Sequence, residues 1–324
     1  MKELIKWLCV VVILFGVESA FAQSSELEVE CPWGKISATL ETPEAGSDTA
    51  IVIIAGSGPT DRDGNSLAAG LRPSSYAMLS QELVAEGFAV LRYDKRAIGR
   101  SQIPAEDVPA LVFEDYVDDV EQIVGVLRDK GFSRVILAGH SEGGLIALIA
   151  TDRQRVAVDG VVLLAAPGFA MDSILLTQLG AQLLPANIPL MFEAQNIIKR
   201  LKSGESVAQE RIPKELVSLF HPVVQPFLIS EMRYDPAEII ARVEQPVLII
   251  SGGHDIQVLP SNGETLAAAQ PRTEHRMFPS MTHVLKDSES DDRMQQLVSV
   301  YSNSNYPLTE GLTEAITEFI TNIK

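Results

Sequence analysis

Gly139-His140-Ser141-Glu142-Gly143 decides the fold, because one short apolar run precedes it and a second apolar run follows it. Residues 134–138 (RVILA) are typical of a buried strand, and residues 144–150 (GLIALIA) are typical of a helix. A G-x-S-x-G motif between a strand and a helix forms a turn so tight that small residues must flank the serine. The strained turn lifts the Ser141 hydroxyl clear of the sheet, beside the positive end of the helix. The stretch therefore predicts a nucleophile elbow.

Apolar runs alternate with amphipathic segments along most of the chain. We expect buried or half-buried strands at residues 27–31, 35–40, 50–55, 89–93, 135–138, 161–165, 247–250 and 275–278. Helices are expected at residues 76–87, around 117–127 and at 308–323. The first two strands form an opening hairpin, and the remaining alternation predicts a mostly parallel, doubly wound α/β sheet.

The alternation stops between Ala166 and Val243. Three apolar helical segments appear there instead, at residues 171–184, 189–201 and 213–232. A long insertion after a strand of such a sheet usually lies over the carboxyl ends of the strands, where ligands bind. We therefore expect a helical cap at about residues 169–240. The alternative is a pair of ordinary packing helices.

The amino terminus has the pattern of a signal peptide. Lys2 and Lys6 make a weakly basic start, residues 7–17 are apolar but too short to span a bilayer, and Ala20-Phe21-Ala22 resembles a cleavage site. We expect cleavage before Gln23, export to a periplasm or beyond, and no stable membrane anchor afterwards. An uncleaved anchor is the alternative. The mature α/β domain would comprise residues 23–324.

Charge and cysteine content exclude several classes of partner and site. A formal net charge of −17 repels nucleic acid and anionic membrane surfaces. Once the signal peptide is removed, Cys31 is the one cysteine left, so no intramolecular disulfide and no cysteine zinc site can form. We expect Cys31 to be a small buried apolar residue. No pattern of metal ligands stands out, and the chemistry expected below requires neither a cofactor nor a metal.

A serine hydroxyl becomes a nucleophile when a base removes its proton and an acid orients that base. Asp255 follows the expected strand at 247–250, and His283 follows the next strand, at 275–278. Both therefore lie in loops at the carboxyl edge of the sheet, as Ser141 does. The order Ser, Asp, His along the chain is the order that a nucleophile elbow requires. We predict Ser141 as nucleophile, His283 as base and Asp255 as the orienting acid.

Other histidines and carboxylates compete for these roles. His140 should face sideways into packing, His254 should point away, His275 lies in a strand and His221 in the cap. Asp61, Asp63 and Asp94 follow the wrong strands for the acid. We expect Asp94 to make a structural ion pair with Arg96.

Taken together, these features resemble an α/β-hydrolase over nearly all of the mature chain. More closely, residues 54–65 (IAGSGPTDRDGN) and Tyr93-Asp94-Lys95-Arg96 are similar to signatures of bacterial secreted hydrolases of the serine-aminopeptidase-like (S33-like) group, which includes many esterases. That group usually continues with Gly-x-Gly-x-Ser, where this chain has Ala97-Ile98-Gly99-Arg100-Ser101. Ala97 is therefore a departure from the group's pattern.

Acyl transfer also needs N–H donors for the developing oxyanion. The residue after the nucleophile supplies one, the backbone N–H of Glu142. The resemblance implies that the N–H of Ser57, in Gly56-Ser57-Gly58, is the other. This glycine run lacks the Lys-Ser/Thr and the three-glycine pattern of phosphate-binding loops. The Glu142 side chain should complement the helix dipole, and it could contact Lys95 or Arg96.

These residues predict a serine hydrolase that cleaves small to medium carboxylic esters, because the cap segments are rich in apolar residues. Three alternatives remain. An aminopeptidase would need acidic cap residues for a free amine, for which Glu193, Glu205, Glu210 and Glu215 are candidates. A thioesterase would use the same triad. A hydrolase-like protein without activity would be a binding protein of a different class.

Overall fold

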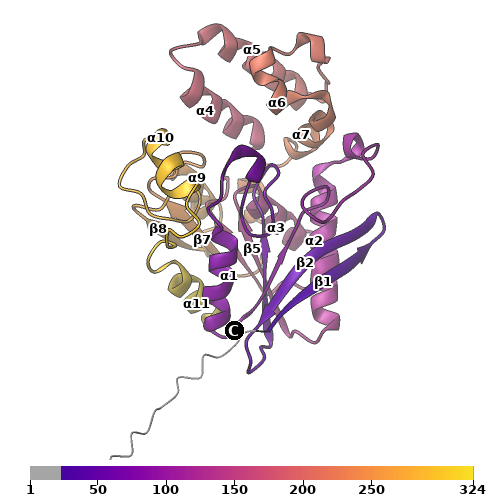
Figure 1. The fold of residues 1–324 in the computed structure, drawn as a ribbon, viewed down its shortest axis with the longest axis vertical. Helices are drawn as coiled ribbons and strands as arrows, with labels where there is room; N and C mark the ends of the chain where they lie inside the picture. Colours follow the sequence, from indigo (N-terminus) through magenta and orange to yellow (C-terminus); the bar gives the residue numbers. More distant parts are fainter. Residues whose placement is uncertain (1–22, 324) are drawn as a thin grey trace, which may run out of the picture.

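The computed structural model describes residues 23–323, and the predicted signal peptide, residues 1–22, lies outside them. An eight-stranded sheet runs through the molecule in the order β1-β2-β4-β3-β5-β6-β7-β8 (Figure 1). The strands are β1 Gln23–Cys31, β2 Gly34–Thr42, β3 Thr49–Ile54, β4 Ala89–Tyr93, β5 Arg134–His140, β6 Gly160–Leu164, β7 Val247–Gly252 and β8 Glu274–Phe278. Only the opening hairpin β1–β2 and the β2–β4 pair are antiparallel among these strands. The predicted α/β sheet is confirmed.

Helices cover both faces of the sheet, which explains why the central strands are apolar on both sides. In β3, Ala50, Val52 and Ile54 pack into the core beneath α2 (Phe113–Asp129) and α3 (Glu142–Asp152). Ile51 and Ile53 alternate with them and pack on the opposite face, against α1 (Ser75–Ala85) and α11 (Leu312–Asn322). The period of two along a strand thus supplies two separate cores.

The short helices α9 (Ser261–Ala269) and α10 (Arg293–Gln296) complete the sheet domain. Helix α11 begins at Leu312, later than the predicted residue 308. Gly311 is its N-cap residue, with φ +81°, and Leu308 is buried in the loop before it. The apolar pattern there reflects core packing of a loop rather than an earlier helix start.

A cluster of helices between β6 and β7 stands above the sheet domain, over the carboxyl ends of the strands (Figure 1). It comprises α4 (Met171–Leu183), α5 (Ile188–Lys202), α6 (Val217–Phe220) and α7 (Gln225–Glu231), and we call it the cap. Its apolar side chains form a core of their own. Helix α8 (Pro236–Ile240) also lies in the predicted cap range, but Ile239 and Ile240 pack into the core of the sheet domain.

The predicted helical segment at residues 213–232 is helical in the structure, but it is not one continuous helix. The segment is divided into short turns and the helices α6 and α7, with Pro222 between the two and Pro226 in the first turn of α7. Proline disfavours helical backbone in the residue before it and cannot donate a helix hydrogen bond, so the apolar periodicity could not continue as one helix.

Two smaller observations concern the rest of the described chain. No helix within residues 23–323 combines the length and apolar character that crossing a bilayer requires. Cys31 is a half-buried free thiol packed against the core of the sheet domain. The pKa of this thiol is raised to about 11, mainly because of its burial.

Candidate active site

The turn between β5 and α3 has the geometry that its sequence predicts. Ser141 has φ +52°, in the left-handed region that non-glycine residues seldom adopt, and its N–H donates to the Leu164 carbonyl over 2.9 Å. A Cβ atom at position 139 would lie 2.2 Å from the Gly143 oxygen, and one at position 143 would lie 2.2 Å from the Ile54 oxygen. Glycine is therefore required on both sides of the serine, where strand and helix meet.

Asp255 and His283 are brought together by the loops that follow β7 and β8. The Nδ1 atom of His283 lies 2.8 Å from Oδ2 of Asp255, and both side chains are buried. Oδ1 of Asp255 accepts the backbone N–H groups of Gln257 and Val258, each over 2.8 Å. The carboxylate is thus fixed on both oxygens, and among residues 23–323 no hydrogen bond is made to the opposite ring nitrogen of His283, Nε2.

Ser141 and His283 line the same cavity, of about 250 Å³, together with Gly56 and Tyr301. The hydrogen bonds of residues 23–323 do not include one between the Ser141 hydroxyl and His283. Such contacts are often long in hydrolases without substrate and tighten when substrate binds. The three predicted residues therefore converge at one edge of the sheet, with the Asp255–His283 contact already made.

His140, expected to face sideways into packing, instead connects two parts of the site. Its Nε2 lies 2.7 Å from the His283 carbonyl oxygen, and its Nδ1 lies 2.7 Å from the Tyr76 hydroxyl. The same hydroxyl accepts the Gly56 N–H over 3.1 Å. Burial, reinforced by the neighbouring His283, lowers the pKa of His140 to about 3. These partners assign a neutral ring that donates from Nε2 and accepts at Nδ1.

The predicted oxyanion donors, Ser57 and Glu142, line a cavity together with Ser141. Lys95 is fully buried behind them, and its Nζ donates to the Gly56 carbonyl over 2.6 Å and to Oε1 of Glu142 over 2.8 Å. The Gly56 carbonyl and the Ser57 N–H belong to one peptide plane, in which they point in opposite directions. Lys95 therefore fixes the direction of the Ser57 N–H, a role that the sequence pattern did not reveal.

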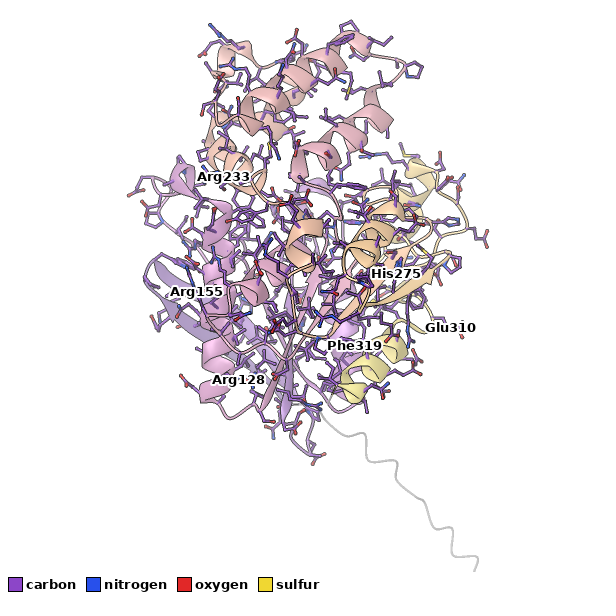
Figure 2. All side chains as sticks on the ribbon, turned by 180° about the vertical axis from the view of Figure 1, so that it is seen from behind. Arg128, Arg155, Arg233, His275, Glu310 and Phe319 are labelled. Carbon is purple, nitrogen blue, oxygen red and sulfur yellow. The ribbon has the colours of Figure 1, made fainter. Side chains whose placement is uncertain are left out.

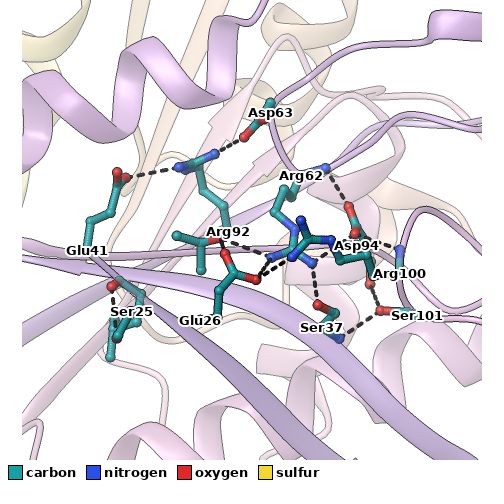
Figure 3. Close-up of polar contacts among 12 residues, drawn as sticks. Ser25, Glu26, Ser37, Glu41, Arg62, Asp63, Arg92, Asp94, Arg100 and Ser101 are labelled. Carbon is teal, nitrogen blue, oxygen red and sulfur yellow. Dashed lines mark hydrogen bonds and ion pairs between the residues drawn. The ribbon is translucent and has the colours of Figure 1, made fainter.

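The predicted ion pair between Asp94 and Arg96 is wrong. Asp94 binds Arg62, with 2.9 Å between Oδ2 and Nη2, within the polar cluster of Figure 3. Arg96 instead turns toward α2, where it binds Asp119 over 2.6 Å and Asp115 over 3.0 Å. Strand β4 ends at Tyr93 and the chain turns from Arg96 onward, with Ala97 at φ +70°, so the alternation of an extended strand does not hold Asp94 and Arg96 on one face and they meet partners from different elements.

The other predicted groups lie elsewhere. Nδ1 of His254 is bonded to the Ser288 carbonyl, and His221 caps a short turn in the cap. His275 lies on β8, labelled in the rear view of Figure 2, and its Nε2 is 3.0 Å from the Ser251 hydroxyl. The four acidic cap residues proposed for amine binding are all exposed and line neither cavity at Ser141: Glu193, Glu205, Glu210 and Glu215. Within residues 23–323 no three His, Cys, Asp or Glu side chains are arranged to hold a metal ion.

A second, larger cavity of about 520 Å³ lies between the cap and the sheet domain. Ser57, Ser141 and Glu142 form part of its floor, and apolar side chains of the cap form its walls, including Ile174, Leu175, Phe227 and Leu228. One charged cap residue, Glu231, also lines it. The sequence reasoning overlooked Glu231, because nothing in its neighbourhood marks it as different from the exposed glutamates.

Comparisons with known proteins agree with this architecture. The family described as "Serine aminopeptidase, S33" matches residues 72–290. The esterase EstD of Thermotoga maritima is 30% identical over 222 residues, which are 68% of this chain and 50% of EstD. The chain thus spans about half of the length of that curated relative, and less of a second one, a human serine hydrolase.

Solved structures show the same fold at low sequence identity. The structure titled "Ferulic Acid bound to Est1E", from Butyrivibrio proteoclasticus, has a TM-score of 0.59 at 19% identity, and the match covers 92% of this chain and 98% of that one. An esterase of Pyrococcus furiosus has a TM-score of 0.56 at 18% identity, with coverages of 93% and 91%. The elbow, the sheet and the family match together lead to one conclusion: this chain is an α/β-hydrolase and belongs to the serine aminopeptidase, S33, family.

Proposed function

We propose that the protein is a serine hydrolase that cleaves carboxylic esters through an acyl-enzyme. The observation that carries the proposal is the 2.8 Å contact between Asp255 and His283 at the cavity that Ser141 also lines. A buried carboxylate on Nδ1 keeps the imidazole proton on that nitrogen, so Nε2 is available as the base.

In the proposed reaction, Nε2 of His283 takes the Ser141 proton while Oγ attacks the ester carbonyl. The N–H groups of Ser57 and Glu142 bind the oxyanion of the tetrahedral intermediate. His283 then gives its proton to the leaving alkoxide, and the alcohol departs. A water molecule, deprotonated by His283, then attacks the acyl-enzyme carbonyl. The bond to Oγ breaks, His283 returns the proton to Oγ, and the carboxylic acid is released from restored Ser141.

Three observations support esters over aminoacyl peptides. The relative with the long match is an esterase, and the walls of the larger cavity are mainly apolar. The acidic residues that an aminopeptidase would use for a free amine, such as Glu193 and Glu215, lie exposed outside both cavities. Small to medium acyl chains suit the cavity of about 520 Å³.

The test is a comparison of p-nitrophenyl butyrate with leucine p-nitroanilide on the purified protein. We expect rapid turnover of the ester and little or none of the anilide. Ser141→Ala and His283→Ala should each lower kcat by roughly 10⁴-fold or more, with Asp255→Asn somewhat less affected. Ser203→Ala, in an exposed turn of the cap, is the matched control and should retain activity. Preferred cleavage of the anilide, or full activity in Ser141→Ala, would overturn the proposal.

We also propose export of the protein, on the basis of the signal pattern in residues 1–22. Amino-terminal sequencing of the protein from its native host should begin at Gln23. A chain that begins at Met1 or Lys2 would contradict export by cleavage.

A further inference from the structure

Glu231 is a buried acid whose partners within the protein are incomplete. It ends α7 of the cap, is 1% exposed, and its Oε1 atom has no hydrogen-bond partner in the described chain. The same residue lines the cavity that has Ser141 in its floor. A buried polar oxygen without a partner is unfavourable, so native proteins seldom keep one without a reason. Its position at a cavity points to a partner in the bound ligand.

The neighbouring charges do not satisfy Glu231, because they satisfy each other. Lys95 binds Glu142 and the Gly56 carbonyl, and both side chains are almost completely buried. Burial raises the pKa of Glu231 well above its ordinary value, the Glu142 carboxylate raises it further, and Lys95 opposes the shift. This shift favours the protonated carboxyl group, which can both donate and accept a hydrogen bond.

The two cavities at Ser141 indicate which half of an ester reaches Glu231. They share Ser57, Pro59, Ser141 and Gln257, but only the smaller one includes His283. The leaving alkoxide must receive its proton from His283, so the alcohol half occupies the smaller cavity. The acyl chain then extends into the larger cavity, toward the cap and Glu231.

We propose that Glu231 is a specificity-determining residue that hydrogen-bonds an uncharged hydroxyl group on the acyl chain of the substrate. The inference rests on the proposed esterase function. The substrate class is an ester whose acyl chain is otherwise apolar, because the chain passes between residues such as Ile174, Leu175 and Phe227. A hydroxyl group can pair with the carboxyl in either protonation state, whereas an ammonium group in the same place would share the cavity with the Lys95 cation.

The test uses three series of ethyl esters with acyl chains of graded length. The chains end in a hydroxyl, in a methyl group in its place, or in an ammonium group, and hydrolysis is followed in a pH-stat. We compare the hydroxyl ester and the methyl ester of the same chain length. At one or more lengths, the wild-type kcat/KM for the hydroxyl ester should be at least about tenfold higher. The ammonium esters should be the poorest substrates.

Variants at position 231 test whether the Glu231 side chain causes the preference for hydroxyl esters. Glu231→Gln keeps the volume and a group that can donate and accept hydrogen bonds, so it should retain a preference for the hydroxyl esters. Glu231→Leu should lose or reverse that preference. Glu193→Leu changes an exposed glutamate of the same cap in the same way and should behave as the wild type.

Absence of a hydroxyl preference at every chain length, or a preference that persists in Glu231→Leu, would overturn the inference. Preference for the ammonium series would replace it with a cation subsite. The wild-type comparison needs no variant, so it decides even if Glu231→Leu fails to fold. Labelling of Ser141 by a fluorophosphonate separates the two proposals. A labelled enzyme without preference refutes only the role of Glu231, whereas a folded, unlabelled wild type refutes the esterase function itself.

Discussion

At the scale of single residues, Lys95 links both proposed oxyanion donors. It binds the carbonyl of the peptide that ends in the Ser57 N–H, and it binds the side chain of Glu142. Lys95→Met should let the Gly56–Ser57 peptide turn and misdirect one donor. We expect kcat for a p-nitrophenyl ester to fall by about 10²–10³-fold with a much smaller change in KM, as when one oxyanion donor is lost.

The Lys95 prediction needs a control for general destabilisation, because the substitution leaves the buried Glu142 carboxylate unpaired. Thermal unfolding identifies the temperature range in which Lys95→Met is folded, and kinetics are measured there. Lys214→Met, at an exposed cap lysine, should have wild-type kinetics. An unchanged kcat in folded Lys95→Met would show that the Ser57 peptide is held without Lys95.

Tyr76 has a different linking role, because its hydroxyl joins the Gly56 N–H to Nδ1 of His140. Tyr76→Phe leaves both of these buried groups without a partner. We expect the free energy of unfolding, measured in urea, to fall by about 1–3 kcal/mol for each of the two unpaired groups. We also expect kcat for a p-nitrophenyl ester to be lower than that of the wild type. Tyr306→Phe, a half-buried tyrosine with no such contact among the described residues, is the control. Equal effects of both substitutions would argue against the link.

The sequence was sufficient to predict that Ser141, Asp255 and His283 lie at one edge of the sheet, because each one follows a strand recognisable by its apolar run. Lys95, Tyr76 and Glu231 were not assigned these roles, because their partners are set by the folded loops rather than by local spacing. Tyr76 and His140, for example, are 64 residues apart. The pairing of Asp94 with Arg96 failed for the same reason: proximity in sequence was taken for contact.

At the scale of elements, the loop after β3 is anchored by the cluster around Asp94 (Figure 3). Oδ1 of Asp94 accepts the Arg62 N–H, and Oδ2 accepts both the Arg62 side chain and the Arg100 N–H, each over 2.9 Å. Burial by itself would raise the pKa of Asp94, but the hydrogen bonds from Arg62 and Arg100 outweigh it and lower the pKa below its ordinary value.

This shift predicts a specific loss of stability in acid. A carboxyl whose pKa is lower in the folded than in the unfolded state stabilises the fold fully above its unfolded pKa of about 3.9. That stabilisation is lost as the pH falls through the folded-state pKa. Urea unfolding of the wild type and of Asp94→Asn between neutral pH and pH 3 measures it: the variant should be less stable at neutral pH, and the difference should shrink in acid. A constant difference would contradict the assignment.

The loop after β4 holds a strained residue where related hydrolases usually have glycine. Ala97 has φ +70°, a left-handed conformation that costs a residue with a Cβ atom roughly 1–2 kcal/mol. Ala97→Gly should therefore raise the free energy of unfolding by up to about 1 kcal/mol, after the greater freedom of glycine in the unfolded chain is subtracted. Ala105→Gly, at an exposed alanine without positive φ, should be neutral or destabilising. Destabilisation by Ala97→Gly would refute the strain.

Strands were the elements that the sequence predicted well, since a strand covered on both faces must be a continuous apolar run. The cap was harder. Its amphipathic segments signalled helices, but Pro222 and Pro226 divided the third one, and α8 returned to the core of the sheet domain. The spacing of apolar residues predicts that one face of a helix is buried. It does not predict whether that face packs in the core of the sheet domain or in the core of the cap.

At the scale of the whole molecule, the cap and the sheet domain have separate apolar cores and meet at the larger cavity. The groups that perform the proposed chemistry lie in loops of the sheet domain, whereas the walls that select the acyl chain come mainly from the cap. We therefore expect substitutions in the cap, such as Leu175→Ala or Phe227→Ala, to change which ester is preferred more than they change the rate of Ser141 phosphonylation by a small fluorophosphonate. The check is to measure kcat/KM for several esters and the rate of Ser141 phosphonylation on the same preparations of each variant. Equal changes in both quantities would contradict the separate roles of cap and sheet domain.

The central claim, an activated serine at position 141, is tested most directly by covalent labelling. The folded protein is treated with a fluorophosphonate, and the modified residue is identified by peptide mapping and mass spectrometry. The account predicts one phosphonyl group per chain, attached to Ser141, and no label in His283→Ala. A folded protein that stays unlabelled, or that carries the label on another residue, would contradict it.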